Sequence, residues 1–115
     1  MKIKIKRAYE DASKNDGVRI LVDRIWPRGL SKEDANLEDW IKEIAPSTKL
    51  RQWFNHEDDK FEEFSVKYKK ELSDHKDLVA RLLEFAKKQT LTLVYSAKNE
   101  KHNQAVVLKE YLEEQ

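Results

Sequence analysis

The chain of 115 residues has no cysteine, only two glycines and two prolines, and no apolar run long enough to cross a bilayer. Without cysteine there can be no disulfide, thiolate nucleophile or cysteine-based metal site. Neither a phosphate loop nor a dinucleotide fingerprint is present among so few glycines, so nucleotide cofactors bound in those ways are excluded. We expect one domain over residues 1–115, cytoplasmic, with no cofactor and no membrane association.

Apolar and charged residues are equally common, at 39% each, and the aromatic side chains comprise three tryptophans, four tyrosines and four phenylalanines. This aromatic content favours a compact core over disorder. The net charge of +1 argues against RNA or single-stranded DNA as a partner. Residues 1–30 hold eight Lys/Arg against four Asp/Glu. That local positive excess favours a small anionic ligand.

Three segments have strand patterns. Residues 2–6 alternate lysine and isoleucine, residues 18–22 form a β-branched run after the turn signal at 15–17, and residues 90–95 form the clearest strand. The link between the first two is short for a helical crossover, so we expect them to be antiparallel or not adjacent. With helices elsewhere, the expected fold class is α/β: a small, mostly parallel sheet flanked by helices in a three-layer α/β/α sandwich.

Helix start signals divide the rest of the chain. Ser31, with Asp34 three residues later, resembles a capping box, and Asn36 is a second N-cap candidate. Ser47 and Asn103 can cap two further helices. Helical spacing of apolar residues then predicts helices over residues 37–44, 47–54, 58–72, 78–86 and 103–112.

The segment 23–29, just past a buried strand, is the main functional candidate. Pro27 restricts Trp26 to an extended conformation, and Gly29 permits a sharp turn after Arg28. The backbone is therefore stiff before Arg28 and adaptable after it, which suits the presentation of a guanidinium at a fixed angle.

The side chains of this segment suit an anion. Arg24 and Arg28 can hold a carboxylate or phosphate through paired hydrogen bonds, and Trp26 can form a flat wall. Asp23 can act as a base or orient an arginine. The structural alternative is that Asp23 pairs with an arginine and Trp26 fills the core.

A second polar segment, residues 95–103, follows the strand at 90–95. If the two strands are parallel neighbours, both segments face one crevice at the carboxyl edge of the sheet. Ser96 and Asn103 offer hydrogen-bond donors there, and His102 can titrate near neutral pH. The alternative is that Asn103 only caps a helix and the remainder is a solvated loop.

The third candidate joins Arg51 and His56 to the turn at residues 45–48. Ser47 is most simply a helix cap, and a serine nucleophile would need a base that only His56 can supply. His56 itself is otherwise a capping or surface residue. The three histidines of the chain are scattered without paired spacing, so we expect no metal site.

The chain resembles the YeaO-like branch of the family of domain of unknown function 488. The most specific motif is Val22-Asp23-Arg24-Ile25-Trp26-Pro27-Arg28-Gly29, supported by matching blocks within 45–56 and 93–108. The resemblance implies a compact bacterial or archaeal α/β protein without an assigned activity. The family pattern includes Asp23, Arg24, Trp26, Arg28, Gly29, Arg51, His56, His102 and Asn103.

The leading hypothesis is therefore a protein that binds or acts on a small anionic metabolite. Arg24 and Arg28, helped by Arg51, would hold the anion, with Trp26, Gly29, Ser96 and Asn103 lining the site. Asp23 with His56 or His102 is the acid–base pair if there is catalysis. The rivals are a non-catalytic regulatory or interaction module and weak RNA or single-stranded DNA binding.

Overall fold

The computed structural model describes residues 1–115 and contains one parallel sheet with strand order β1-β4-β2-β3. The strands are β1 (Ile3–Arg7), β2 (Val18–Leu21), β3 (Asp39–Trp40) and β4 (Leu91–Tyr95). The two predicted N-terminal strands are not adjacent, because β4 lies between them and pairs with both. All five residues of β4 are buried, which makes it the centre of the sheet.

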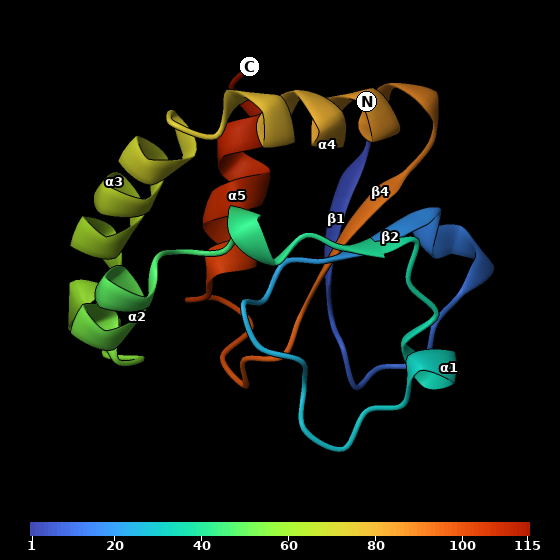
Figure 1. The fold of residues 1–115 in the computed structure, drawn as a ribbon, viewed down its shortest axis with the longest axis horizontal. Helices are drawn as coiled ribbons and strands as arrows, with labels where there is room; N and C mark the ends of the chain where they lie inside the picture. Colours follow the sequence, from blue (N-terminus) through green and yellow to red (C-terminus); the bar gives the residue numbers. More distant parts are fainter.

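The helices are α1 (Lys32–Ala35), α2 (Thr48–Phe54), α3 (Phe61–Leu72), α4 (Lys76–Lys88) and α5 (Gln104–Glu113). Short 3-10 turns lie at Lys14–Asp16, Lys42–Ile44 and Asp58–Lys60. Figure 1 shows α5 between the strands and the α2–α3 pair, with α4 running across the top of the molecule. The α/β fold with a small parallel sheet flanked by helices is confirmed.

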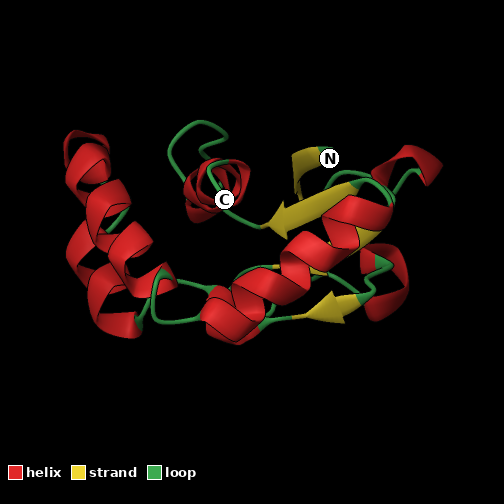
Figure 2. Cartoon of the chain, turned by 90° about the horizontal axis from the view of Figure 1, so that it is seen from above, coloured by secondary structure: helices red, strands yellow, loops and turns green.

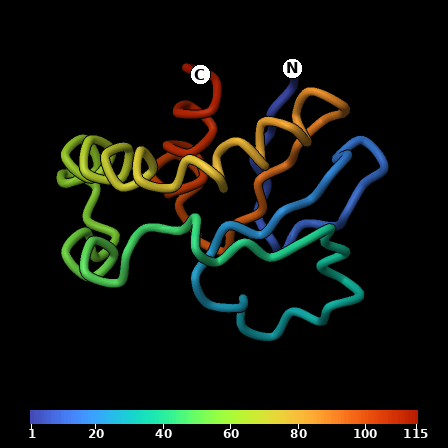
Figure 3. The backbone as a smooth tube through the Cα atoms, turned by 45° about the horizontal axis from the view of Figure 1, so that its top comes forward, coloured from blue at the N-terminus to red at the C-terminus, as the bar shows by residue number.

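The two faces of the sheet are covered differently. One face packs into the main core of 21 buried residues, to which α2, α3, α4 and α5 all contribute. On the other face Leu21 and Val94 form a small cluster with Ala8, covered by Trp26 and Trp40. Trp26 lies in the long connection between β2 and β3, in which α1 is the only helix, and Trp40 lies in β3 itself (Figures 2 and 3).

The helix predicted over residues 37–44 is wrong. Residues 39–40 form the edge strand β3, and Asn36 caps the C-terminus of α1 in a left-handed conformation (φ 46°) instead of starting a helix. The backbone N–H of Glu38 donates to the Arg19 carbonyl and that of Ile41 to the Leu21 carbonyl. This segment therefore pairs with the free edge of β2. The backbone hydrogen bonds of that pairing outweigh the helical preference that the spacing of its apolar residues indicates.

The remaining caps are where the sequence places them. Ser31, Ser47 and Asn103 each accept a backbone N–H in the first turn of α1, α2 and α5. The reciprocal capping box, however, occurs at Ser13 and Asp16. None of the five α-helices has the length and the apolar composition that a membrane span requires.

Candidate functional site

The segments that follow β2 and β4 meet at the carboxyl edge of the sheet, as their parallel pairing requires. Asp23, only 7% exposed, accepts hydrogen bonds from the backbone N–H of Ser96 at 3.0 Å and from the Ser96 hydroxyl. The side-chain amide of Gln104, in the first turn of α5, donates to the other oxygen of the same carboxyl group. Asp23 thus joins the ends of β2, β4 and α5.

Burial raises the pKa of Asp23 above its ordinary value. The hydrogen bonds from Ser96 and Gln104, and the positive charge of Arg51, oppose this rise because they stabilise the carboxylate. The charge of Arg51 therefore acts on Asp23 although the two side chains form no ion pair.

Two arginines at this edge hold the backbone. The Arg24 guanidinium donates to the carbonyls of Ala45 and Pro46 at 3.1 and 3.2 Å. The Arg7 guanidinium donates to the carbonyls of Ser96 and Ala97. Both arginines thus fix the loops around Asp23. The Nε–H and Nη2–H groups of Arg24 are already used by these carbonyls.

Arg51 differs from both. It projects from α2 and is half-buried, and its guanidinium has no hydrogen-bond or ion-pair partner among the protein's own groups. His56 follows shortly after α2, where Asn55 and His56 both have left-handed backbones (φ 46° and 56°). The His56 ring lies 6.3 Å from that of Phe54, and the residue is exposed.

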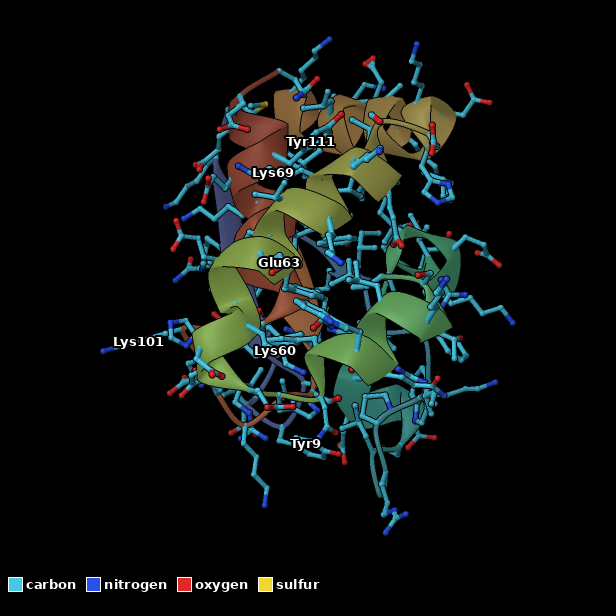
Figure 4. The ribbon with its side chains drawn as sticks, turned by 90° about the vertical axis from the view of Figure 1, so that its left-hand side faces the viewer. Tyr9, Lys60, Glu63, Lys69, Lys101 and Tyr111 are labelled. Atoms are coloured by element: carbon cyan, nitrogen blue, oxygen red, sulfur yellow. The ribbon has the colours of Figure 1, made fainter.

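His102 lies against the start of α3. Its Nδ1 is 3.0 Å from a carboxylate oxygen of Asp58, and its ring stacks on Phe61 with centroids 4.6 Å apart. The side-chain amide of Asn99 donates to the same oxygen of Asp58. Figure 4 shows Lys101 of this loop on the same side of the molecule as Lys60, the last residue of the 3-10 turn before α3. The structure pairs His102 with Asp58, whereas the sequence hypothesis pairs it with Asp23.

Trp26, further along the 23–29 segment, covers the other face of the sheet. The Trp26 indole N–H donates to the Leu30 carbonyl at 2.7 Å, and its ring meets Trp40 edge-on at 5.5 Å. Arg28 is exposed and its carbonyl accepts the Tyr9 hydroxyl. Gly29 has a positive φ of 78°, as the predicted turn requires.

A hollow of about 510 Å³ lies beside Gly29, between the chain after β1 and α1. Four carboxylate residues line it: Glu10, Asp11, Glu33 and Asp34. A second hollow, of about 430 Å³, lies near Gly17 and Gln89, before the N-terminal ends of β2 and β4. The acidic lining of the first hollow does not suit an anion.

The predicted residues thus form separate groups. Asp23 and Ser96 are hydrogen-bonded to each other, whereas Arg51 acts on Asp23 only through its charge. His102 packs on the Asp58–Phe61 turn, and Trp26, Arg28 and Gly29 lie apart. Asn103 is buried, and its side chain accepts the Val106 N–H as a helix cap.

Gln104 is the site residue that sequence reasoning missed. Its signal was its place immediately after the predicted cap Asn103, in the first helical turn at the carboxyl edge of the sheet. Asp58, which holds His102, is the first residue of the helix predicted over residues 58–72 and has no other signal in the sequence.

Comparison with known proteins places the chain in a family. Residues 2–115 match the family described as the inactive DUF488-N3 subclade, and the chain belongs to it. The uncharacterized protein YeaO of Escherichia coli K12 is 50% identical over 112 residues, which cover 97% of both chains. Uncharacterized proteins of Mycobacterium bovis and Mycobacterium tuberculosis H37Rv are 38% identical over 111 residues, 96% of this chain and 93% of theirs. No solved structure matches.

Proposed function

We propose that the protein binds a small anionic metabolite without transforming it, and that Arg51 anchors the ligand at the carboxyl edge of the sheet. The observation that carries this proposal is the state of Arg51, a half-buried residue whose guanidinium has no protein partner, in the helix that follows the Ala45–Pro46 turn held by Arg24. Guanidinium groups bind carboxylates and phosphates through paired N–H donors, and these donors are free in Arg51.

Ser96 and Gln104 complete the site on the side of the sheet. Both bind Asp23, so their positions are fixed before a ligand arrives. A preorganised site loses less conformational entropy on binding than a mobile one. The oxygen atoms of the Ser96 hydroxyl and the Gln104 amide retain the capacity to accept hydrogen bonds from a ligand.

Two observations favour binding over catalysis. Two of the three candidate acids and bases are engaged: Asp23 accepts three hydrogen bonds, and His102 is paired with Asp58. The third, His56, is exposed. A general base must reach the proton that it removes. The description of the family as inactive agrees with a binding role.

The proposal is tested by calorimetric titration with acetate as the probe. The Arg51→Gln variant is expected to bind acetate about ten- to a hundredfold more weakly than the wild type, because it loses a charged hydrogen-bonding group. Lys49→Gln removes the same charge from an exposed position of the same helix and should leave the affinity unchanged.

The Arg28→Gln variant decides between the two arginines that the sequence offers. With Arg51 as the anchor, this variant binds acetate as the wild type does. If Arg28→Gln loses acetate binding and Arg51→Gln retains it, the anchor is Arg28 and the proposed site is wrong. An absence of acetate binding to the wild type rejects the proposal altogether.

A further inference from the structure

The second face of the sheet, on which Ala8, Leu21 and Val94 form the small buried cluster, has only a thin cover. The longer helices α2 to α5 all contribute to the core on the opposite face, whereas α1 has four residues. The apolar side chains packed against the small cluster are only partly buried: Trp26, Leu30, Leu37 and Trp40. This face therefore leaves apolar surface in contact with water.

Two more large apolar side chains are exposed in the loops of the same cover. Tyr9, which follows β1, is 44% exposed, and Ile25, which precedes Trp26, is 60% exposed. The Tyr9 hydroxyl donates to the carbonyl of Arg28, so the two loops are joined. Aromatic and aliphatic side chains gathered at one exposed face are typical of a protein interaction surface.

The hollow of about 510 Å³ beside Gly29 adjoins this cover. Its apolar lining consists of Ala8, Tyr9, Ala12 and Leu30. Ala8 belongs to the small buried cluster, and Leu30 packs against it. The hollow is therefore a recess in the same thinly covered face, with apolar side chains available inside it.

The carboxylates that line the hollow have no cation beside them. They are Glu10, Asp11, Glu33 and Asp34, and all four are exposed. None of them takes part in an ion pair of the protein. By contrast, the buried carboxylate of Asp16 on the same face of the sheet is paired with three cationic side chains. The hollow thus has a negative charge that the protein itself does not compensate.

We propose that this surface docks a basic segment of a partner protein, in which lysine or arginine side chains lie next to an apolar one. A basic side chain complements both parts of the hollow, because its hydrocarbon stem packs on apolar groups while its charged end reaches the carboxylates. The apolar neighbour in the segment packs on the exposed side chains of Tyr9 and Ile25. Arg51 and the proposed anion site play no part in this interaction.

The charge and the apolar content of the surface together decide the class of partner. Nucleic acids and anionic membrane surfaces are negative, so the uncompensated carboxylates repel them. A free polyamine would satisfy the charge but would leave the apolar side chains around the hollow in water. A protein segment with basic and apolar side chains complements both features.

The test is an NMR titration of the isotope-labelled protein, at low ionic strength, with a short synthetic peptide in which arginines flank a leucine. Saturable shifts are expected for the Trp26 indole and for the backbone amides of the four lining carboxylate residues. The same peptide with glutamate in place of arginine should not bind. With alanine in place of leucine it should bind about threefold more weakly or worse, because less apolar surface is buried.

A double variant with Glu33→Gln and Asp34→Asn removes two of the four carboxylates. It is expected to bind the arginine peptide about three- to tenfold more weakly, the usual effect of losing two exposed charge pairs. The matched control combines Glu62→Gln and Glu84→Gln, which remove the same charge from exposed positions on α3 and α4. The control should bind as the wild type does, and circular dichroism establishes that both variants are folded.

Four results would overturn the proposal. The first is the absence of saturable shifts with the arginine peptide, and the second is equal peptide affinity of the wild type and the folded Glu33→Gln, Asp34→Asn variant. The third is binding of spermidine as tight as that of the peptide with the same shifts, which would assign the hollow to a free polyamine. The fourth is a wild type that is dimeric and a double variant that is monomeric in sedimentation, which would assign the surface to a second copy of the chain.

Discussion

Replacement of Asp16 by asparagine is expected to lower the free energy of unfolding by about 3–5 kcal/mol, the cost of leaving a buried charge without its partner. Asp16 is 1% exposed and Arg19 3% exposed, and their side chains form an ion pair at 2.7 Å. Arg19 also donates to the carbonyls of Ala35 and Asn36, so it cannot leave the interior without breaking the attachment of α1. Lys6 reaches the same carboxylate at 3.2 Å.

Urea denaturation of the wild type and the variant measures this loss. The Ser13 backbone N–H donates to the Asp16 side chain, and the side-chain oxygen of asparagine can accept the same hydrogen bond. The comparison therefore measures the loss of the negative charge. The control is Glu63→Gln, which breaks an exposed ion pair with Lys67 and should change the unfolding free energy by less than about 1 kcal/mol. Equal, small losses in both variants would show that the buried pair is not structurally important.

The same pair sets a pH dependence. Burial alone would raise the pKa of Asp16, but hydrogen bonds from Ser13, Lys6 and Arg19 bring it below its ordinary value of 3.8. A lowered pKa means that the folded state binds the proton less tightly than the unfolded state. The stabilisation is therefore present above 3.8 and is lost as the pH falls through the folded pKa. The difference between wild type and Asp16→Asn should shrink over that acidic range.

Replacement of Gly17 by alanine is expected to destabilise the fold by roughly 2–5 kcal/mol, the sum of a left-handed backbone penalty and a steric clash. Gly17 has φ +63°, and a Cβ there would lie 2.1 Å from the carbonyl oxygen of Thr90. That carbonyl accepts the backbone N–H of Val18 at 2.9 Å, which fixes the start of β2 beside β4. Relief of the clash would therefore disturb the pairing of the two central strands.

Gly29→Ala is the matched control. Gly29 also has a positive φ, of 78°, but nothing lies within 4 Å of the position that its Cβ would take. Only the backbone penalty of about 1–2 kcal/mol remains. In thermal and urea unfolding, the Gly17→Ala variant should be clearly less stable than the Gly29→Ala variant. If Gly29→Ala were the less stable variant, the backbone of Thr90 could move to make room for a Cβ at residue 17, and the start of β2 would not be tightly fixed.

Local pattern was sufficient to predict the strands and most helices. Residues 90–95 were predicted as a strand from their apolar run, and Ser47 and Asn103 act as caps because their side chains can accept a free N–H of the first turn. The turn signal at 15–17 ends in a glycine with a positive φ, as turn chemistry requires. These features depend on residues that lie close together in the chain.

Features that depend on distant partners were harder to predict. Asn36 is of a residue type that often caps helix N-termini, but residues 39–40 pair with the free edge of β2 and form a strand. Arg24 has the charge of a ligand-binding residue, but the turn at Ala45 and Pro46 presents two carbonyls to it. Neither partner is visible from the local sequence. The meeting of Asp23 and Ser96, in contrast, followed from the rule for the carboxyl ends of parallel strands.

The most direct test of the account is an NMR titration of the arginine side chains with acetate, followed through their Nε–H signals. The Arg51 signal is expected to shift with saturable dependence on acetate, while the Arg24 and Arg19 signals stay in place because their Nε–H groups already donate to backbone carbonyls. A shift confined to Arg28, or an Arg51 signal that does not respond, would contradict the claim that Arg51 anchors the ligand.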